Sequence, residues 1–247
     1  MTSMKNAPEL ERVSLAFSEA AARTDPTARI ASRIWPTAGE MVDHLGTIQR
    51  WAAEVLRTGR TVDEARHERP TGRDRVEWFV EGAEALVREI DSADPTSRCW
   101  TFVGPGTNAF WGRRMVHEAT KHLWDIRTAV VPDPPMPAEI EPTTAAAIID
   151  EFDEVFIARA RRNGIAPLQG SVLLQATDSD RSWLVEPDWT VRRDAAGEDS
   201  SAALRASTAD LALMLWERAD PWLLGHRFDR SGDEHVLHML CETPVHL

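Results

Sequence analysis

The sequence is poor in cysteine, has no long hydrophobic run and carries no excess of positive charge. Its 247 residues include two cysteines, Cys99 and Cys241, which excludes a disulfide framework. The longest run of large apolar residues, near 211–216, is far too short to cross a bilayer. The net charge of −12 argues against a nucleic-acid partner, because binding to phosphates requires a cationic surface.

The beginning of the chain also lacks the pattern of a signal peptide. Glu9, Glu11 and Glu19 interrupt the first thirty residues, and no long apolar segment accompanies them. We therefore expect a soluble, cytoplasmic protein in a reducing compartment, without a membrane partner. The composition, 43% hydrophobic and 28% charged, is typical of globular proteins, and the length suits one large domain or two modest ones.

Hydrophobic periodicity predicts a helical N-terminal part. The expected helices cover 7–23, 38–57, 73–90, 109–130 and 142–162. Thr37 and Glu40 have the spacing of a capping box, and Asn108 is a candidate N-cap for the fourth helix. Residues 94–108 are interpreted as a surface loop.

The pattern changes near residue 165. Short strands are expected over 171–177, 182–186, 190–193 and 202–206, followed by helices over 208–218 and 233–241. The fold class is therefore mixed, α + α/β. We expect a helical bundle over 1–165 and a small α+β domain over 166–247.

Two of the predicted helices carry side chains suited to a metal. His44 lies within the apolar stripe of helix 38–57, and Glu118 and His122 lie one turn apart on the apolar face of helix 109–130. Two imidazoles and a carboxylate are the usual ligands of a catalytic zinc that keeps an open position. Asp125 follows His122 by three residues and is the natural acceptor for an imidazole N–H. Zinc is favoured, although other divalent metals suit the same ligands.

Simpler interpretations of these residues stay open. A histidine such as His44 on an apolar stripe is often a hydrogen-bonded core residue, and a Glu/His pair at this spacing is often a surface pair. His117 would replace His122 if the fourth helix were rotated, although its angle on the helical wheel points it sideways.

Other motifs were weighed against the metal site. Residues 104–109 match G-x-G-x-x-A, but no βαβ unit surrounds them, so a dinucleotide site is not expected. Cys99 has no base beside it in the sequence, and Cys241 is expected in the core of the last helix. His226, His235 and His238 form either a second metal site or a solvated face, and the solvated face is favoured.

Several motifs together resemble one known family. They are His44-Leu45-Gly46 with Trp51-Ala52, Arg113 to Glu118, His122 to Asp125, and Asp210-Leu211 with Leu215 to Arg218. In this order they are similar to the mycothiol-dependent maleylpyruvate isomerase family. The resemblance implies a DinB-like metal-binding bundle followed by a sterol-carrier-like C-terminal domain.

The resemblance also implies roles for individual residues. His44, Glu118 and His122 would hold the metal. Arg218, on the first C-terminal helix, would reach the cleft between the domains and bind an anionic group of substrate or cosubstrate. Glu217 departs from the family, which often has glycine there, and this weakens the placement of Arg218.

The residues predict a metal-dependent enzyme that uses a small thiol as a bound thiolate, and the resemblance implies that this thiol is mycothiol. The thiolate would be transferred to a small electrophile, or would catalyse cis/trans isomerisation of a maleylpyruvate-like acid. Asp125 would orient His122, and Arg218 would bind the anion. We expect a monomer or a small homo-oligomer. The alternatives are a non-enzymatic small-molecule or lipid-binding protein, and a metal-dependent hydrolase with Asp125 as its base.

Overall fold

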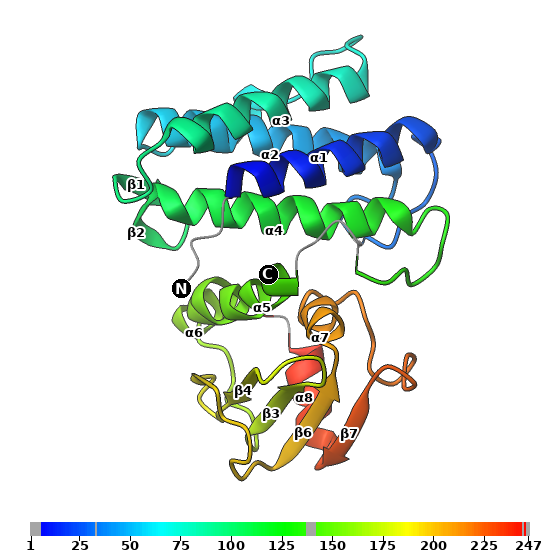
Figure 1. Ribbon diagram of the computed structural model, residues 1–247, viewed down its shortest axis with the longest axis vertical. Coiled ribbons are helices and arrows are strands. Elements are labelled where there is room, and N and C mark those ends of the chain that lie inside the picture. Colours follow the sequence, from blue (N-terminus) through cyan, green and yellow to red (C-terminus); the bar gives the residue numbers. More distant parts are fainter. Residues whose placement is uncertain (1–5, 33, 137–141, 244, 246–247) are drawn as a thin grey trace. The chain divides into compact units, whose positions relative to one another are not determined.

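We analysed a computed structural model, which describes residues 6–32, 34–136, 142–243 and 245. The chain divides into two compact units, residues 1–140 and 141–247. The first is helical and the second is built on a small sheet (Figure 1). The mixed fold class is therefore confirmed. No helix in the described parts of the chain is long and apolar enough to span a membrane.

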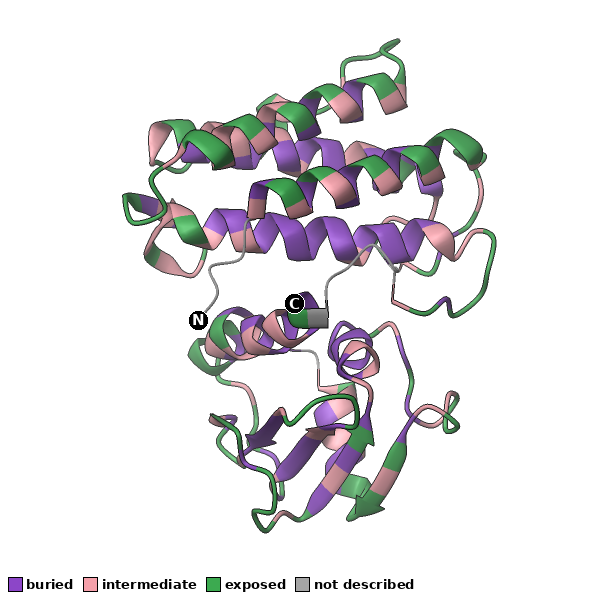
Figure 2. Cartoon of the chain, in the orientation of Figure 1, coloured by how far each residue is buried: buried purple, intermediate pink, exposed green. Residues whose placement is uncertain are grey.

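Four long helices make up most of the first unit. They are α1 (Asn6–Arg23), α2 (Ala38–Thr58), α3 (Arg75–Ser92) and α4 (Asn108–Arg127), and a short 3-10 helix, η1 (Glu64–His67), follows α2. Helix α1 packs on α3 and α4, and α2 packs on α3 and α4. Figure 2 shows that buried positions dominate α4, whereas α3 alternates buried and exposed positions.

Local sequence signals explain where α2 begins and ends. The capping box is present: the Glu40 N–H donates to Thr37 Oγ1 and the Thr37 N–H donates to Glu40 Oε2. Gly59 ends the helix in the left-handed conformation, with φ of 67°. The apolar stripe faces the core, and Met41, Leu45 and Val55 are fully buried. His44 is thereby held at the edge of this buried stripe.

A glycine on α2 permits the close approach of α3. A Cβ atom at Gly46 would lie 2.2 Å from the Trp78 ring, so any larger residue would displace that ring from its place against α2. Gly46 follows His44 by two residues, so this contact with α3 holds the part of α2 that carries His44.

The loop prediction for 94–108 was wrong. Strands β1 (Arg98–Thr101) and β2 (Gly104–Thr107) form an antiparallel hairpin there. The glycines of the G-x-G-x-x-A motif therefore lie in a hairpin strand and not in a βαβ turn. The predicted N-cap, Asn108, was wrong, since Thr107 is the N-cap of α4. The Asn108 side chain instead donates to the Asp94 carbonyl.

The second unit holds a five-stranded sheet in the order β5-β4-β3-β6-β7. The strands are β3 (Val172–Ala176), β4 (Ser182–Val185), β5 (Val191–Arg193), β6 (Ala202–Ala206) and β7 (Asp229–Gly232). Strands β3 and β6 are parallel, and the other neighbours are antiparallel. The sequence analysis missed β7, because its Asp-Arg-Ser-Gly sequence has no apolar alternation. Helices α7 (Thr208–Leu215) and α8 (Glu234–Glu242) pack on β3 and β6.

The predicted helix 142–162 belongs to the second unit. It consists of α5 (Pro142–Glu151), a π-helical segment η2 (Phe152–Ile157) and α6 (Ala158–Arg162). The predicted domain boundary at 165 placed it in the bundle, but α5 packs on α7 and the division falls at residue 140. Helical periodicity shows that a helix has an apolar face and leaves its packing partner open.

Candidate metal centre

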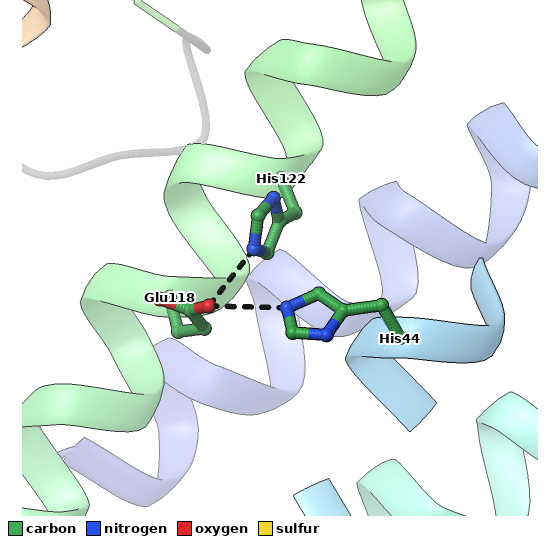
Figure 3. Close-up of side chains that lie close together, drawn as sticks. All are labelled: His44, Glu118 and His122. Atoms are coloured by element: carbon green, nitrogen blue, oxygen red, sulfur yellow. Dashed lines mark hydrogen bonds and ion pairs between the residues drawn. The ribbon is translucent and has the colours of Figure 1, made fainter. Parts of the chain in front are cut away.

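Helices α2 and α4 bring three potential metal ligands together. The Nε2 atom of His44 lies 3.4 Å from Glu118 Oε1, and the Nε2 atom of His122 lies 2.9 Å from the same oxygen (Figure 3). All three ligand atoms lie within 4.8 Å of one another. No other group of three or more His, Cys, Asp or Glu side chains with such geometry occurs in the described residues. The donor set therefore suits one small divalent cation.

His122 shows most directly that the centre fits a cation. Its Nδ1 lies 2.9 Å from Asp125 Oδ2, and its Nε2 lies 2.9 Å from Glu118 Oε1. In the tautomer whose Nδ1–H donates to Asp125, Nε2 presents its lone pair beside Glu118 Oε1, which is the arrangement that a metal ligand needs. Asp125, fully buried, favours this tautomer.

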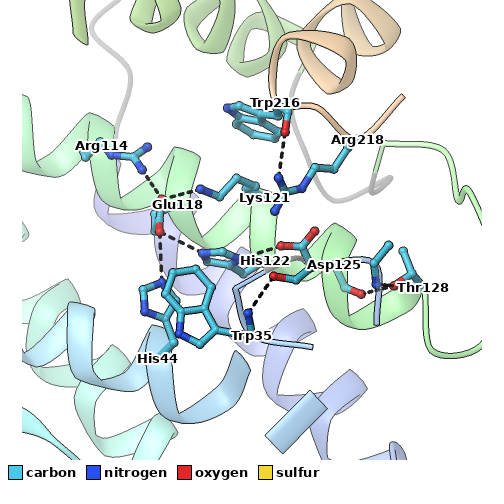
Figure 4. Close-up of polar contacts among 12 residues, drawn as sticks. Trp35, His44, Arg114, Glu118, Lys121, His122, Asp125, Thr128, Trp216 and Arg218 are labelled. Atoms are coloured by element: carbon cyan, nitrogen blue, oxygen red, sulfur yellow. Dashed lines mark hydrogen bonds and ion pairs between the residues drawn. The ribbon is translucent and has the colours of Figure 1, made fainter. Parts of the chain in front are cut away.

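Glu118 is ionised, and its two oxygens have different partners. Oε1 faces the two histidines, whereas Oε2 accepts from Arg114 Nη2 and lies 3.3 Å from Lys121 Nζ (Figure 4). Burial alone would raise the pKa of the Glu118 carboxyl. The positive charges of Arg114 and Lys121 outweigh this effect and hold that pKa well below its usual range. A carboxylate is therefore ready to bind a cation at neutral pH.

His44 is held against an aromatic ring. The Trp35 ring stacks on the His44 ring, with centroids 3.5 Å apart and planes 15° apart. Burial lowers the pKa of His44 to about 4, despite the opposing hydrogen bond to Glu118. The imidazole is therefore neutral at pH 7, which is the form that coordinates metals.

An open pocket of about 400 Å³ lies beside His44 within the first unit. Trp35, His44 and Thr47 line it together with Glu40, Asp43, Glu64, Glu68 and Arg69. Arg69 and Arg75 both bind the Asp43 carboxylate, which ties the segment after η1 and the start of α3 to α2. Of the three potential ligands, His44 is the one that lines this pocket.

Two other residues considered in the sequence are not members of this group. His117 is fully buried and outside the three-ligand cluster. Arg218 lies in the second unit, and α7 ends at Leu215, so the expected helix 208–218 is too long and Arg218 follows it. Glu217 has φ of 60°, and Arg218 Nη1 donates to the Trp216 carbonyl at 2.8 Å. The anion-binding role of Arg218 stays a prediction.

Arg114, Lys121 and Trp35 also contact the centre, and none of the three was predicted to do so. Arg114 lies four residues before Glu118, and Lys121 lies three residues after it. Opposite charges at these spacings on a helix indicate ion pairs, so the sequence contained the information needed to predict both contacts. Trp35 precedes α2 in an irregular segment, where no periodicity relates it to His44.

Comparisons with known proteins agree with this description. Residues 8–127 match the family model described as the mycothiol maleylpyruvate isomerase N-terminal domain. The search of curated proteins found no match.

Solved structures share the fold. A crystal structure of the mycothiol-dependent maleylpyruvate isomerase has a TM-score of 0.54 at 14% identity, and a mutant of it has a TM-score of 0.56 at 13% identity. Each comparison covers 94% of this chain and 93% of the other. The motifs read from the sequence and the family match therefore agree: residues 8–127 of this chain belong to the mycothiol maleylpyruvate isomerase N-terminal domain family.

Proposed function

We propose that this protein is a metal-dependent enzyme that uses mycothiol as a thiolate nucleophile toward a small electrophile. The observation that carries the proposal is the convergence of His44, Glu118 and His122 within 4.8 Å, in a domain of this family. Two imidazoles and one carboxylate leave a divalent cation with an open position. Zinc is the favoured ion.

The residues of the centre have roles that follow from their contacts, and the role of Arg218 rests on the family resemblance. His44, Glu118 and His122 would hold the cation, which when bound lowers the pKa of a thiol so that the thiolate forms near neutral pH. Asp125 orients His122 through the bond to Nδ1. Trp35 limits rotation of the His44 ring by stacking on it. Arg218 would bind a carboxylate or similar anion.

The thiolate would add to an electrophilic carbon conjugated to a carbonyl, forming a C–S bond. If the adduct rotates about its former double bond and expels the thiolate, the net reaction is cis/trans isomerisation of a maleylpyruvate-like acid. If the adduct is released with the C–S bond intact, the net reaction is S-transfer. The same residues support both outcomes, and the electrophile decides between them.

The metal centre is tested by measuring bound metal. Purified wild type is expected to hold about one divalent ion per chain, and His122→Ala is expected to hold almost none. His238→Ala is the matched control, because His238 also pairs with a glutamate one helical turn away. Equal metal content in wild type and His122→Ala would disprove the assignment.

The reaction is tested with mycothiol and a panel of electrophiles, maleylpyruvate included. Mass spectrometry detects thiol adducts, and ultraviolet absorbance follows isomerisation. We expect product only with both the metal-loaded protein and mycothiol. Hydrolysis of esters or amides without thiol would instead support the hydrolase, although the Asp125 carboxylate is already engaged by His122.

A further inference from the structure

Two cations from one helix bind the side of Glu118 that does not face the histidines. Arg114 Nη2 donates to Glu118 Oε2, and Lys121 Nζ lies 3.3 Å from that oxygen (Figure 4). Both cations are on α4, four residues before and three residues after the carboxylate. The carboxylate is therefore shared between a candidate metal position at Oε1 and two fixed positive charges at Oε2.

Four charged side chains meet at the centre, and the Glu64 carboxylate, which lines the pocket beside His44, lies outside this set. Arg114 and Lys121 contribute two positive charges, and Glu118 and Asp125 contribute two negative charges. A divalent cation held here would therefore keep its double positive charge among these residues. A buried charge of this kind requires a counter-charge, because water solvates it poorly.

We infer that Arg114 and Lys121 make this a centre that selects an anion for its open coordination position. This inference rests on the proposed metal centre and names its ligand class: a monoanion with a soft or nitrogen donor atom, of which a thiolate is one. The two cations act through Glu118, by offsetting the carboxylate charge, and so they are positioning residues. They lower the affinity of the centre for the cation and raise the affinity of the bound cation for an anionic ligand.

If this role is correct, loss of one of these charges should change the cation affinity and the anion affinity in opposite directions. Simple support of a buried carboxylate predicts no such opposition. Lys121→Met keeps the length of the side chain and removes its charge. We expect this variant to bind a divalent cation about tenfold more tightly and an anionic ligand about tenfold more weakly, since one unit charge near the centre is lost. A role in packing alone would weaken both affinities or leave both unchanged.

The experiment uses the full-length protein loaded with cobalt(II), whose visible absorption reports changes in coordination. Competition with a chelator gives the cobalt affinity. Titration with azide, a monoanion, gives the anion affinity, and titration with imidazole gives the affinity for a neutral ligand. Imidazole should bind wild type and Lys121→Met alike, because its binding adds no charge.

Three further variants complete the test. Lys121→Arg keeps the charge and should retain the azide affinity of wild type. Arg114→Met removes the other charge and should change both affinities in the same directions as Lys121→Met. Arg88→Met is the matched control, because Arg88 forms an exposed pair with Glu84 four residues away on α3. It should change neither affinity.

The outcomes separate this inference from the proposed function. If wild type binds no cobalt at His44, Glu118 and His122, the metal centre itself is wrong. If wild type binds cobalt and Lys121→Met and Arg114→Met have wild-type azide affinity, the metal centre stands and the anion-selecting role is overturned. A fall in cobalt affinity in both variants overturns it as well.

Discussion

The two units each contain a histidine and a glutamate one helical turn apart, but only one pair belongs to a candidate metal centre. In the first unit His122 Nε2 lies 2.9 Å from Glu118 Oε1, and in the second His238 Nδ1 lies 2.9 Å from Glu242 Oε1. The His122 side chain is fully buried, whereas 42% of the His238 side chain is exposed. An exposed pair of this kind contributes little to stability.

Both units also stack a tryptophan on a histidine. Trp35 lies 3.5 Å from His44 and Trp222 lies 3.8 Å from His238, measured between ring centroids. The difference is that His44 comes from a second helix and faces the Glu118/His122 pair. Helical spacing is therefore enough to bring a histidine and a glutamate together. A potential metal site also requires burial and a ligand from another element.

The largest expected effect is the loss of a ligand. His122→Ala should weaken zinc binding by about 1000-fold or more, equivalent to about 4 kcal/mol, while His238→Ala leaves it unchanged. Chelator competition measures both affinities. A similar loss in the two variants would remove the distinction between the two pairs.

Removal of the buried carboxylate should lower the stability of the metal-free protein, in addition to removing a ligand. In the metal-free protein Glu118→Gln removes the carboxylate charge that Arg114 and Lys121 contact, and breaking a buried ion pair costs about 3 kcal/mol. Glu242→Gln, in the exposed pair, should change the free energy of unfolding by less than about 0.5 kcal/mol. Urea unfolding of the two variants measures this contrast, and equal losses would contradict it.

The partner of a ligand has a smaller effect than the ligand. Asp125→Asn keeps the shape of the side chain but removes the carboxylate that accepts from His122 Nδ1. Zinc affinity should fall by about 10-fold to 100-fold. Isothermal titration with zinc checks this value. Wild-type affinity would show that Asp125 does not orient the ligand.

The smallest expected effect concerns the stacked rings. Trp35→Leu removes the aromatic contact with His44, which is worth about 1 kcal/mol, so zinc affinity should fall severalfold. Trp222→Leu removes the equivalent stack in the second unit and should leave zinc affinity unaltered. If both variants bind zinc as wild type does, the Trp35 stack does not restrain His44.

Much of the candidate centre could be predicted because helical geometry is local. The wheel of helix 109–130 aligned Glu118 with His122 and turned His117 aside, and the capping box located the start of the helix that carries His44. The hairpin at 98–107 was missed because its second strand, Gly-Pro-Gly-Thr, has no apolar side chain to show alternation.

The side chains that share a helix face follow from the amino-acid order alone, because the 3.6-residue period depends only on the backbone of that helix. Packing between elements places His44 3.4 Å from Glu118, 74 residues away, and helix 142–162 in the second unit. It also decided how the two oxygens of Glu118 are shared. These outcomes depend on which apolar faces bury one another, and that is a property of the whole packed chain.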